Sequence, residues 1–258
     1  MLTWLAARLK GSAPAATSDL ASMAVPAGQR VYAIGDIHGC STLLDRMHQL
    51  IRDDLVRNPA AEPGMVYLGD YCDRGPDSRG VYERLVTPDA GLPPAIPLKG
   101  NHEEMFLQFI SSPDMFPVWR DLGGSETLVS YGVDPKLLRI QRDFTAARDA
   151  LLSRMPEAHR MLLDGLATSF QWGPYYFCHA GIRPGVALAR QAPADLMWIR
   201  HEFLSSKADH GRRVIHGHTP CDEPEVLPNR INVDTGAYAT GRLTAVVLDA
   251  DGVRWLRT

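Results

Sequence analysis

The chain has 258 residues, of which 45% are hydrophobic and 22% are charged, and its net charge is −3. This length and composition are typical of a globular protein with one large hydrophobic core, and they exclude a disordered or fibrous chain. The small net charge excludes long-range attraction to nucleic acid or acidic membranes, so local groups must hold any anionic substrate. No apolar run is long enough to span a bilayer. We therefore expect neither nucleic acid nor a membrane as a partner.

Residues 1–28 are predicted to form a flexible leader before a folded domain at 29–258. The first residues, MLTWLAARLK, place apolar side chains before the basic Arg8 and Lys10, which is the reverse of a secretory signal. The segment that follows is rich in small residues. We therefore expect a cytoplasmic protein whose cysteines stay reduced.

The first half of the domain alternates between strand and helix patterns. Apolar runs at Arg30–Ile37 and Met65–Leu68 predict strands, with a helical stripe at Thr42–Leu55 between them. A second helix is expected at Ser78–Val86, and the proline-rich stretch Leu92–Pro97 predicts a short strand near a sheet edge. This alternation makes right-handed parallel crossovers the default connection.

Residues 103–167 differ in character and predict a helical insertion without strands. Its helical patterns lie at Glu103–Ile110, Gly124–Tyr131, Lys136–Ser153 and Glu157–Ala167. Strand patterns return at Tyr175–Cys178, Arg213–His216, Arg230–Val233, Leu243–Leu248 and Val253–Leu256. The Asp251-Gly252 step is typical of a hairpin turn between the last two strands. We expect an α/β sandwich of two mixed β-sheets flanked by helices.

Five short apolar runs end in residues that can bind metal ions. In chain order they are AIGDIHG, YLGDYCDRG, PLKGNHE, FCHAG and VIHGHTP. Each is interpreted as a buried strand with Asp, Asn or His at its carboxyl end, where open α/β sheets place their sites. One such ending is ordinary, because Asp after Gly commonly caps a loop. Five in this order predict a two-metal phosphoester hydrolase.

The candidate ligands offer oxygen and nitrogen. Asp36 and His38 lie two residues apart at a strand end, so both can bind one ion, and the carboxylate of Asp70 can bridge two ions. The remaining candidates are Asn101, His179 and His218, with His216 competing for the place of His218. A set without thiolates suits Mn²⁺, Fe, Zn²⁺ or Mg²⁺ rather than a closed structural zinc site.

Two such ions would supply much of the chemistry. Cations about 3.5–4 Å apart lower the pKa of a shared water and clamp phosphoryl oxygens, which predicts in-line attack by a metal-bridging hydroxide. The leaving oxygen needs a proton, and His102 can supply it if a carboxylate such as Asp73 orients the ring. The planar donor fork of Arg74 would then face the phosphate.

The four cysteines form no CxxC pair, which removes support for a zinc ribbon or a thioredoxin-like motif. They are Cys40, Cys72, Cys178 and Cys221, each within three residues of a predicted ligand. Two interpretations stay open. They are small buried residues beside a tight site, or Cys72 makes the site redox-sensitive.

The blocks GDIHG, GDYCDRG, GNHE, HAG and HGHTP together resemble the signature blocks of the phosphoprotein phosphatase family of calcineurin-like metallophosphoesterases, above all its short prokaryotic and phage-type members. The resemblance runs in order from about Arg30 to Asp249, and it implies a calcineurin-like fold. It implies Asp36, His38 and Asp70 at the first metal, and Asp70, Asn101, His179 and His218 at the second. It also implies that His102 and Asp73 form the acid pair.

Two arginines usually bind phosphate in that family, with the metal-bound Asn101 as a further phosphate contact. Arg74 matches one arginine, and the block MWIRHEFL, similar to a block in bacterial members, makes Arg200 the expected second. Trp198 in the same block is expected in the core. Pro220 stands where wider metallophosphoesterases carry a second His of G-H-x-H, so the first metal should have fewer protein ligands.

The resemblance implies a metal-dependent protein serine/threonine phosphatase that acts on phosphoproteins or phosphopeptides. We expect the protein to be a monomer. It would use two divalent ions, Mn²⁺ ahead of Fe, Zn²⁺ or Mg²⁺. The alternative is a symmetrical dinucleoside polyphosphate hydrolase that cleaves diadenosine tetraphosphate. In those relatives the stretch that matches GDYCDRG commonly lacks the second Asp, so Asp73 favours the phosphomonoesterase. A third hypothesis, a non-catalytic phosphate-binding or protein-binding module, is disfavoured by the intact ligand set.

Overall fold

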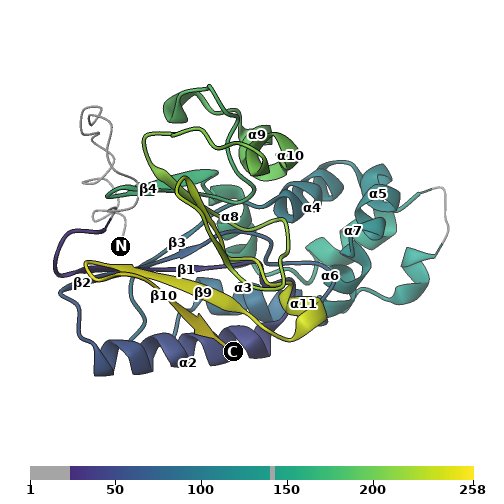
Figure 1. Ribbon diagram of the computed structural model, residues 1–258. Helices are drawn as coiled ribbons and strands as arrows, with labels where there is room; N and C mark the ends of the chain where they lie inside the picture. Colours follow the sequence, from purple (N-terminus) through teal and green to yellow (C-terminus); the bar gives the residue numbers. More distant parts are fainter. Residues whose placement is uncertain (1–23, 140–142) are drawn as a thin grey trace.

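Two five-stranded β-sheets pack against each other in the computed structural model, which describes residues 24–139 and 143–258 (Figure 1). The first sheet has the order β10-β9-β1-β2-β3, and the second β4-β5-β6-β8-β7. The first contains β1 (Gln29–Ile34), β2 (Glu62–Tyr67), β3 (Ala95–Pro97), β9 (Thr244–Asp249) and β10 (Gly252–Arg257). The second contains β4 (Ser169–Trp172), β5 (Tyr175–Cys178), β6 (Arg213–His216), β7 (Glu225–Val226) and β8 (Arg230–Asn232).

Each sheet mixes parallel and antiparallel pairs, as predicted. Strand β1 runs parallel to β2 and antiparallel to β9, while β5, β6 and β8 are parallel and β4 is antiparallel to β5. The predicted hairpin is also present, because Gly252 pairs with Asp249 and adopts φ 118° at the turn. The expected α/β sandwich of two mixed sheets is confirmed.

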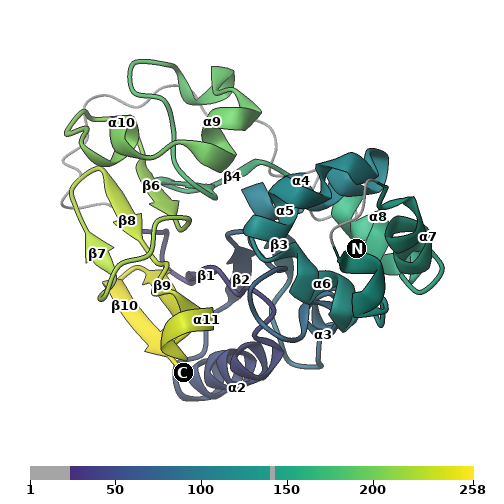
Figure 2. The ribbon, with the colours of Figure 1, turned by 90° about the vertical axis from the view of Figure 1, so that its right-hand side faces the viewer.

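Helices cover the outer faces of the sandwich and form the insertion. The α-helices are α2 (Ser41–Arg57), α3 (Ser78–Val86), α4 (Asn101–Ser111), α5 (Phe116–Asp121), α6 (Gly124–Ser130), α7 (Thr145–Leu152), α8 (Glu157–Gly165), α9 (Pro193–Trp198), α10 (His201–Leu204) and α11 (Ala237–Thr240). Short 3₁₀ turns are η2 (Pro113–Met115), η3 (Pro135–Leu138) and η4 (Leu188–Arg190). Figure 2 shows the insertion helices α4 to α8 gathered on one side, with α9 and α10 on the other.

The core is layered because side chains along a strand point alternately to opposite faces. In β1, Val31 and Ala33 pack between the two sheets, whereas Tyr32 and Ile34 belong to the apolar cluster shared with α2 and the insertion. A third cluster joins the second sheet to α9 and α10. The order of layers is therefore helix, sheet, sheet, helix, with every residue of β1 after Gln29 buried.

One predicted helix, Lys136–Ser153, is wrong. The 3₁₀ turn η3 ends at Leu138, Arg139 is extended at φ −68° and ψ 163°, and a separate helix, α7, begins only at Thr145. Residues 140–142 lie outside the described ranges. The buried ring of Phe144 packs 4.8 Å from that of Phe116, centroid to centroid. This tertiary contact fixes the chain just before α7 and interrupts the helical periodicity.

Several further helices and strands were not predicted, namely α5, α9, α10, α11, β4 and β7. Helix α5 contains Pro117 in its first turn, where the missing N–H costs nothing because that group has no partner within the helix. Strands β4 and β7 are short and partly exposed, so they lack a strong apolar pattern. The strand expected at Arg30–Ile37 ends at Ile34, because Ile37 and His38 donate their backbone N–H groups to the Asp70 carbonyl instead.

The predicted leader at 1–28 lies outside the described residues except for 24–28. There Val25 is 2% exposed and packs in the core between the sheets. The body of the domain therefore begins slightly before the predicted boundary. Within the described ranges, no helix combines the length and hydropathy needed to cross a bilayer.

Candidate metal centre and active site

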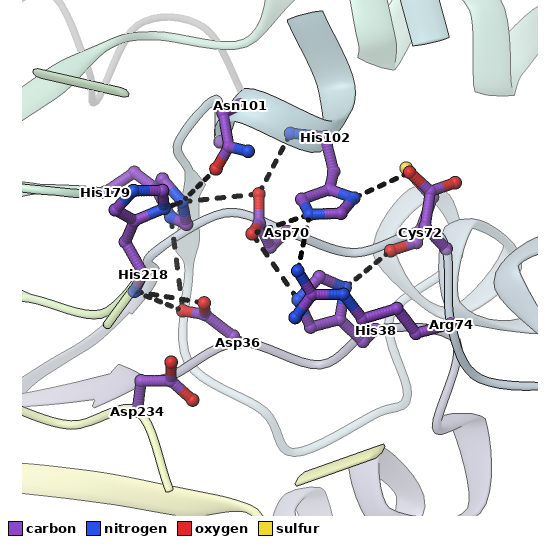
Figure 3. Close-up of polar contacts among 12 residues, drawn as sticks. Asp36, His38, Asp70, Cys72, Arg74, Asn101, His102, His179, His218 and Asp234 are labelled. Carbon is purple, nitrogen blue, oxygen red and sulfur yellow. Dashed lines mark hydrogen bonds and ion pairs between the residues drawn. The ribbon is translucent and has the colours of Figure 1, made fainter. Parts of the chain in front are cut away.

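The loops at the carboxyl ends of strands from both sheets converge on one buried cluster of polar side chains (Figure 3). It contains all six predicted metal ligands: Asp36 and His38 after β1, Asp70 after β2, Asn101 at the start of α4, His179 after β5 and His218 after β6. Each is at most 5% exposed. The structure thus brings together residues that are far apart in the sequence.

The backbone of these loops is strained. Among the described residues, the non-glycine positions with positive φ are His38, Asp70, Asp73, Arg74 and His218. Such conformations cost about 1–3 kcal/mol each and persist only where the surroundings impose them. All five belong to the predicted site, so the strain is concentrated where side chains must be aimed.

Asp70 lies at the centre of the cluster, between two groups of potential ligands. Its Oδ1 is 3.3 Å from His179 Nε2, and its Oδ2 is 3.5 Å from His38 Nε2. Two sets of three side chains have ligand atoms within 4.8 Å of one another, and Asp70 belongs to both. They are His38, Asp70 and His102, and Asp70, His179 and His218. This placement suits a carboxylate that bridges two cations.

The atoms around His179 fit a cation better than a proton. Its Nδ1 lies 2.9 Å from the Leu68 carbonyl, so this nitrogen carries a hydrogen. Its Nε2 then faces Asn101 Oδ1 at 2.9 Å and His218 Nδ1 at 3.2 Å, in addition to Asp70. A single ring hydrogen cannot satisfy three acceptors. The converging lone pairs are the donor set expected for a divalent ion bound by oxygen and nitrogen.

The electrostatics of the cluster support the same interpretation. Burial lowers the pKa of His38 to about 3 and that of His218 to about 2, so both rings stay neutral and keep a lone pair for a metal. Burial opposes a charge on Asp70, but His179 and its neighbours outweigh it and hold the Asp70 pKa well below its ordinary value. Burial also opposes a charge on His179, yet Asp70 and Asp36 raise its pKa to about 10. The carboxylates therefore attract positive charge to this point.

The ligand set expected for the first metal contains Asp36, whereas the observed group of neighbouring ligand atoms around His38 and Asp70 contains His102. His38 Nδ1 lies 2.8 Å from the Cys72 carbonyl, which leaves Nε2 free to face Asp70. Asp36 instead accepts the backbone N–H of His218, at 3.0 Å from its Oδ2. The place beside His38 and Asp70 is shared by His102, whose Nε2 is 3.8 Å from Asp70 Oδ2.

His102 and Asp73 form a buried pair. His102 Nδ1 is 2.7 Å from Asp73 Oδ2, and both side chains are at most 1% exposed. The insertion holds the carboxylate in place, since Trp119 Nε1 donates to Asp73 Oδ2 at 2.8 Å and Thr127 Oγ1 donates to Oδ1 at 2.5 Å. Although burial favours a neutral ring, Asp70 and Asp73 raise the pKa of His102. The Nε2 atom is thus suited to carry a proton towards the site.

The two predicted phosphate-binding arginines approach from different elements. Arg74 NH2 lies 3.3 Å from His102 Nε2, and the Arg74 backbone N–H donates to the Gly123 carbonyl at 3.3 Å. Arg200 is exposed at the start of α10, and its NH1 donates to Thr219 Oγ1 at 3.2 Å, one residue beyond His218. Arg200 thereby borders the cluster, and no hydrogen bond or ion pair joins its side chain to the six ligands within the described residues.

Glu103 was given no chemical role in the sequence, yet it organises the loop after β2. Its buried carboxylate accepts backbone N–H groups from Asp70 and Tyr71, both at 2.8 Å, and from Gly100 at 3.0 Å. Its position three residues after Gly100, as in a capping box, was the available signal.

Asp234 was also missed. It follows β8, as the ligands follow their strands, and its charge helps to raise the pKa of Asp36, after burial itself. The same pattern of a strand ending in Asp, here RINVDTG, could have identified it.

Burial bears on three minor expectations, for Cys72, Trp198 and His216. Cys72 is fully buried, and burial raises the pKa of its thiol well above the ordinary value, which disfavours the redox-sensitive interpretation. Trp198 was expected in the core, but it is 37% exposed and its indole N–H is bonded to Glu104. His216 is buried against Phe203, with ring centroids 5.1 Å apart, and does not face Asp70.

Comparison with known proteins extends this description. The family model described as calcineurin-like phosphoesterase matches residues 29–254. The bis(5'-nucleosyl)-tetraphosphatase PrpE [asymmetrical] of Bacillus thuringiensis is 24% identical over 239 residues, covering 83% of this chain and 88% of that protein. The protein of the same name from Anoxybacillus flavithermus is 24% identical over 233 residues, with the same coverage of 83% and 88%.

Solved structures show the same fold. One named as a candidate diadenosine tetraphosphatase has a TM-score of 0.57 at 19% identity and covers 91% of this chain and 98% of its own. A cold-active protein tyrosine phosphatase has a TM-score of 0.54 at 16% identity and covers 91% of this chain and 81% of its own. At these identities the likeness concerns the fold alone.

Proposed function

The chain belongs to the calcineurin-like phosphoesterases, whose members bind two divalent metal ions, and we propose that it is a phosphomonoesterase that prefers phosphoserine and phosphothreonine in proteins. The proposal includes Mn²⁺ as the preferred ion, phosphoproteins or phosphopeptides as the partners, a monomeric state and a cytoplasmic location. The short prokaryotic and phage-type phosphatases remain the proposed subgroup.

The proposed metal-binding residues are the six buried side chains described above. Asp36, His38 and Asp70 would hold one ion, and Asp70, Asn101, His179 and His218 the other. When bound, such ions supply an acidified water and offset the charge of the phosphoryl group. We assign the binding of the phosphoryl oxygens to Arg74 and Arg200, together with the amide of Asn101.

The remaining step is protonation of the leaving oxygen, which we assign to His102. Its Nε2 faces the cluster, while Asp73 binds Nδ1 and stabilises the protonated ring. An alkoxide from serine or threonine is a poor leaving group and needs this proton. The observation that carries the proposal is therefore the fully buried Asp73 carboxylate, held by Trp119 and Thr127 behind His102.

The second candidate function is hydrolysis of a dinucleoside tetraphosphate, which the names of the relatives favour. The sequence suggested a symmetrical hydrolase as the alternative, whereas these relatives are named asymmetrical, so asymmetrical cleavage becomes the alternative considered. A phosphate leaving group needs less protonation than a serine alkoxide. That cleavage would make little use of His102 and Asp73.

A direct comparison of rates tests the choice. The wild-type protein and the His102→Asn variant are assayed with Mn²⁺ on a phosphoserine peptide and on diadenosine tetraphosphate. We expect the peptide to be the better substrate and to lose about 10²–10⁴ in kcat in the variant. Faster turnover of diadenosine tetraphosphate that is insensitive to the variant would favour the second function. The nucleotide products then tell asymmetrical cleavage (ATP and AMP) from symmetrical cleavage (ADP alone).

The non-catalytic hypothesis has its own test. Release of nitrophenol from p-nitrophenyl phosphate is measured with Mn²⁺ and again after addition of a chelator. Turnover that depends on the metal is expected. Its absence would leave a binding module as the remaining interpretation.

A further inference from the structure

Tyr238 is an exposed aromatic residue beside the metal cluster for which the proposed mechanism has no use. It lies on α11, in the loop that follows β8, and 43% of its surface is exposed. The loop is firmly built: Gly236 and Gly241 bracket the helix at φ 65° and 70°, and the Gly236 N–H donates to Asp234 Oδ1 at 2.8 Å. The position of the ring therefore follows from the backbone around Asp234.

Within the described part of the chain, the ring makes an aromatic contact with His38 and a cation–π contact with Arg74, and both residues belong to the site. Its centroid is 5.3 Å from that of the His38 ring, at an interplanar angle of 82°. The guanidinium carbon of Arg74 lies 4.8 Å from the Tyr238 ring centroid, over its face. An arginine at this distance is attracted by the negative face of the ring. No hydrogen bond joins the Tyr238 hydroxyl to any residue in 24–139 or 143–258, so the ring itself makes the contact.

This contact restricts the Arg74 side chain, which otherwise loses conformational freedom only when it binds a phosphate. A long arginine side chain has about 2 kcal/mol of rotamer entropy to lose when it binds a phosphate in one orientation. Arg74 itself adopts φ 66°, and its backbone N–H donates to the Gly123 carbonyl. These backbone constraints leave the side-chain torsions free. The Tyr238 ring packs against the guanidinium, and His102 Nε2 lies 3.3 Å from Arg74 NH2. Arg200 is restrained differently, by the Thr219 hydroxyl.

We propose that Tyr238 is a positioning residue that orders the Arg74 guanidinium over its ring, so that its donors are directed at the phosphoryl group of the substrate. The inference rests on the proposed phosphomonoesterase function and adds a determinant of phosphate affinity to it. Because Tyr238 acts through Arg74 on the phosphoryl group, its effect must be the same for every leaving group. The same loss must also appear in the binding of inorganic phosphate, which has no leaving group.

Three variants of Tyr238 separate the aromatic face from bulk and from the hydroxyl. Tyr238→Phe keeps the face, Tyr238→Leu keeps bulk alone and Tyr238→Ala removes both. With Mn²⁺, we expect Ala and Leu to lower kcat/KM about three- to tenfold on a phosphoserine peptide and on p-nitrophenyl phosphate. The inhibition constant of inorganic phosphate should rise by the same factor, and Phe should stay within about twofold of the wild type. A Leu variant as active as Phe, or a loss on one leaving group only, would overturn the proposal.

A double-mutant cycle with Arg74 tests the coupling. In an Arg74→Ala background there is no guanidinium to order, so Tyr238→Ala should have no further effect. The matched control is Arg200→Ala, which has no contact with Tyr238 among the described residues. In the Arg200→Ala background, the fold-losses in kcat/KM caused by Arg200→Ala and by Tyr238→Ala should multiply. An undiminished effect of Tyr238→Ala in the Arg74→Ala background would remove Arg74 from the explanation.

Failure of the inference can be told from failure of the proposed function. If the wild type lacks phosphomonoesterase activity, the proposed function is wrong. The Tyr238 and Arg74 double-mutant cycle is then repeated with phosphate binding as its readout, measured as the rise in Tm that inorganic phosphate causes in the presence of Mn²⁺. If phosphate causes no such rise either, both proposals are overturned. The Tm of each variant without phosphate, expected close to that of the wild type because the residue is exposed, excludes a general loss of structure.

Discussion

Replacing Asp73 with Asn removes the negative charge behind His102 while leaving the side-chain volume almost unchanged. In the native protein this carboxylate accepts hydrogen bonds from Trp119 Nε1 and Thr127 Oγ1, and His102 Nδ1 lies 2.7 Å from it. An Asn side chain has a single oxygen acceptor. Its amide must therefore either face His102 with an N–H group or turn that group towards Trp119 and Thr127, which are donors themselves.

The magnitude follows from the lost charge. A hydrogen bond to a charged group in a buried site contributes about 1.5–3 kcal/mol, or roughly 10- to 150-fold in an equilibrium between the two states of the His102 ring. The ring must also keep a hydrogen on Nδ1 while Nε2 carries the proton to be donated, and an amide N–H facing Nδ1 would oppose this doubly protonated form. We therefore expect Asp73→Asn to lower kcat by about 10²–10³ on a phosphoserine peptide.

The assay compares two leaving groups. Nitrophenolate is stable as an anion and needs little protonation, so Asp73→Asn should cost less than about tenfold on p-nitrophenyl phosphate. Thr127→Val is the matched control, because it removes the hydroxyl that donates to the Asp73 carboxylate and accepts the Asp73 backbone N–H, but keeps the charge. It should affect both substrates slightly. The double variant with His102→Asn should be no worse than His102→Asn alone, since the pair acts as a unit.

Two results would refute this reasoning. Equal losses on both substrates would show that Asp73 does not serve protonation of the leaving group. Wild-type activity of Asp73→Asn on the peptide would show that His102 needs no charged partner. Thermal unfolding of the variant is measured alongside, and His102→Asn repeats the test if the variant is destabilised.

The remaining predictions concern metal binding and stability. Asp70→Asn should reduce the tightly bound Mn²⁺, measured by elemental analysis, at both positions, and a variant that retains two ions would show that Asp70 is no bridge. Glu103→Gln should lower stability by about 2–3 kcal/mol and weaken metal binding, because the amide would face backbone N–H donors of the Asp70 loop; an unchanged Tm would contradict this. Burial opposes a charge on Asp54, but hydrogen bonds from Arg254, Tyr32 and Asn58 outweigh it and hold the Asp54 pKa below its ordinary value. Asp54→Asn should therefore cost about 2 kcal/mol in denaturant unfolding at pH 7, and the difference from wild type should shrink as the pH falls below about 4; a constant difference would refute the linkage.

Local signals in the chain were sufficient for much of the architecture. The helix at Ser78–Val86 and the strand at Arg213–His216 were predicted with their observed bounds, because periodicity and flanking turn residues are properties of adjacent positions. The six candidate ligands could be found for the same reason. Each follows a short buried strand, and the carboxyl ends of such strands meet in an α/β sheet.

Contacts between segments that are distant in the sequence could not be predicted, because no local pattern marks them. Asp73 obtains its hydrogen bonds from residues 46 and 54 positions further along the chain, on α5 and α6, and nothing periodic marks Trp119 or Thr127 as its partners. The surroundings of Arg74 depend likewise on Tyr238, from the segment that connects β8 of the second sheet to β9 of the first. The sequence alone was therefore sufficient to identify the candidate residues for binding metals and phosphate. Tertiary packing decided how those residues are oriented and which groups restrain them, because directions and distances between separate loops arise only when the two sheets and the insertion pack together.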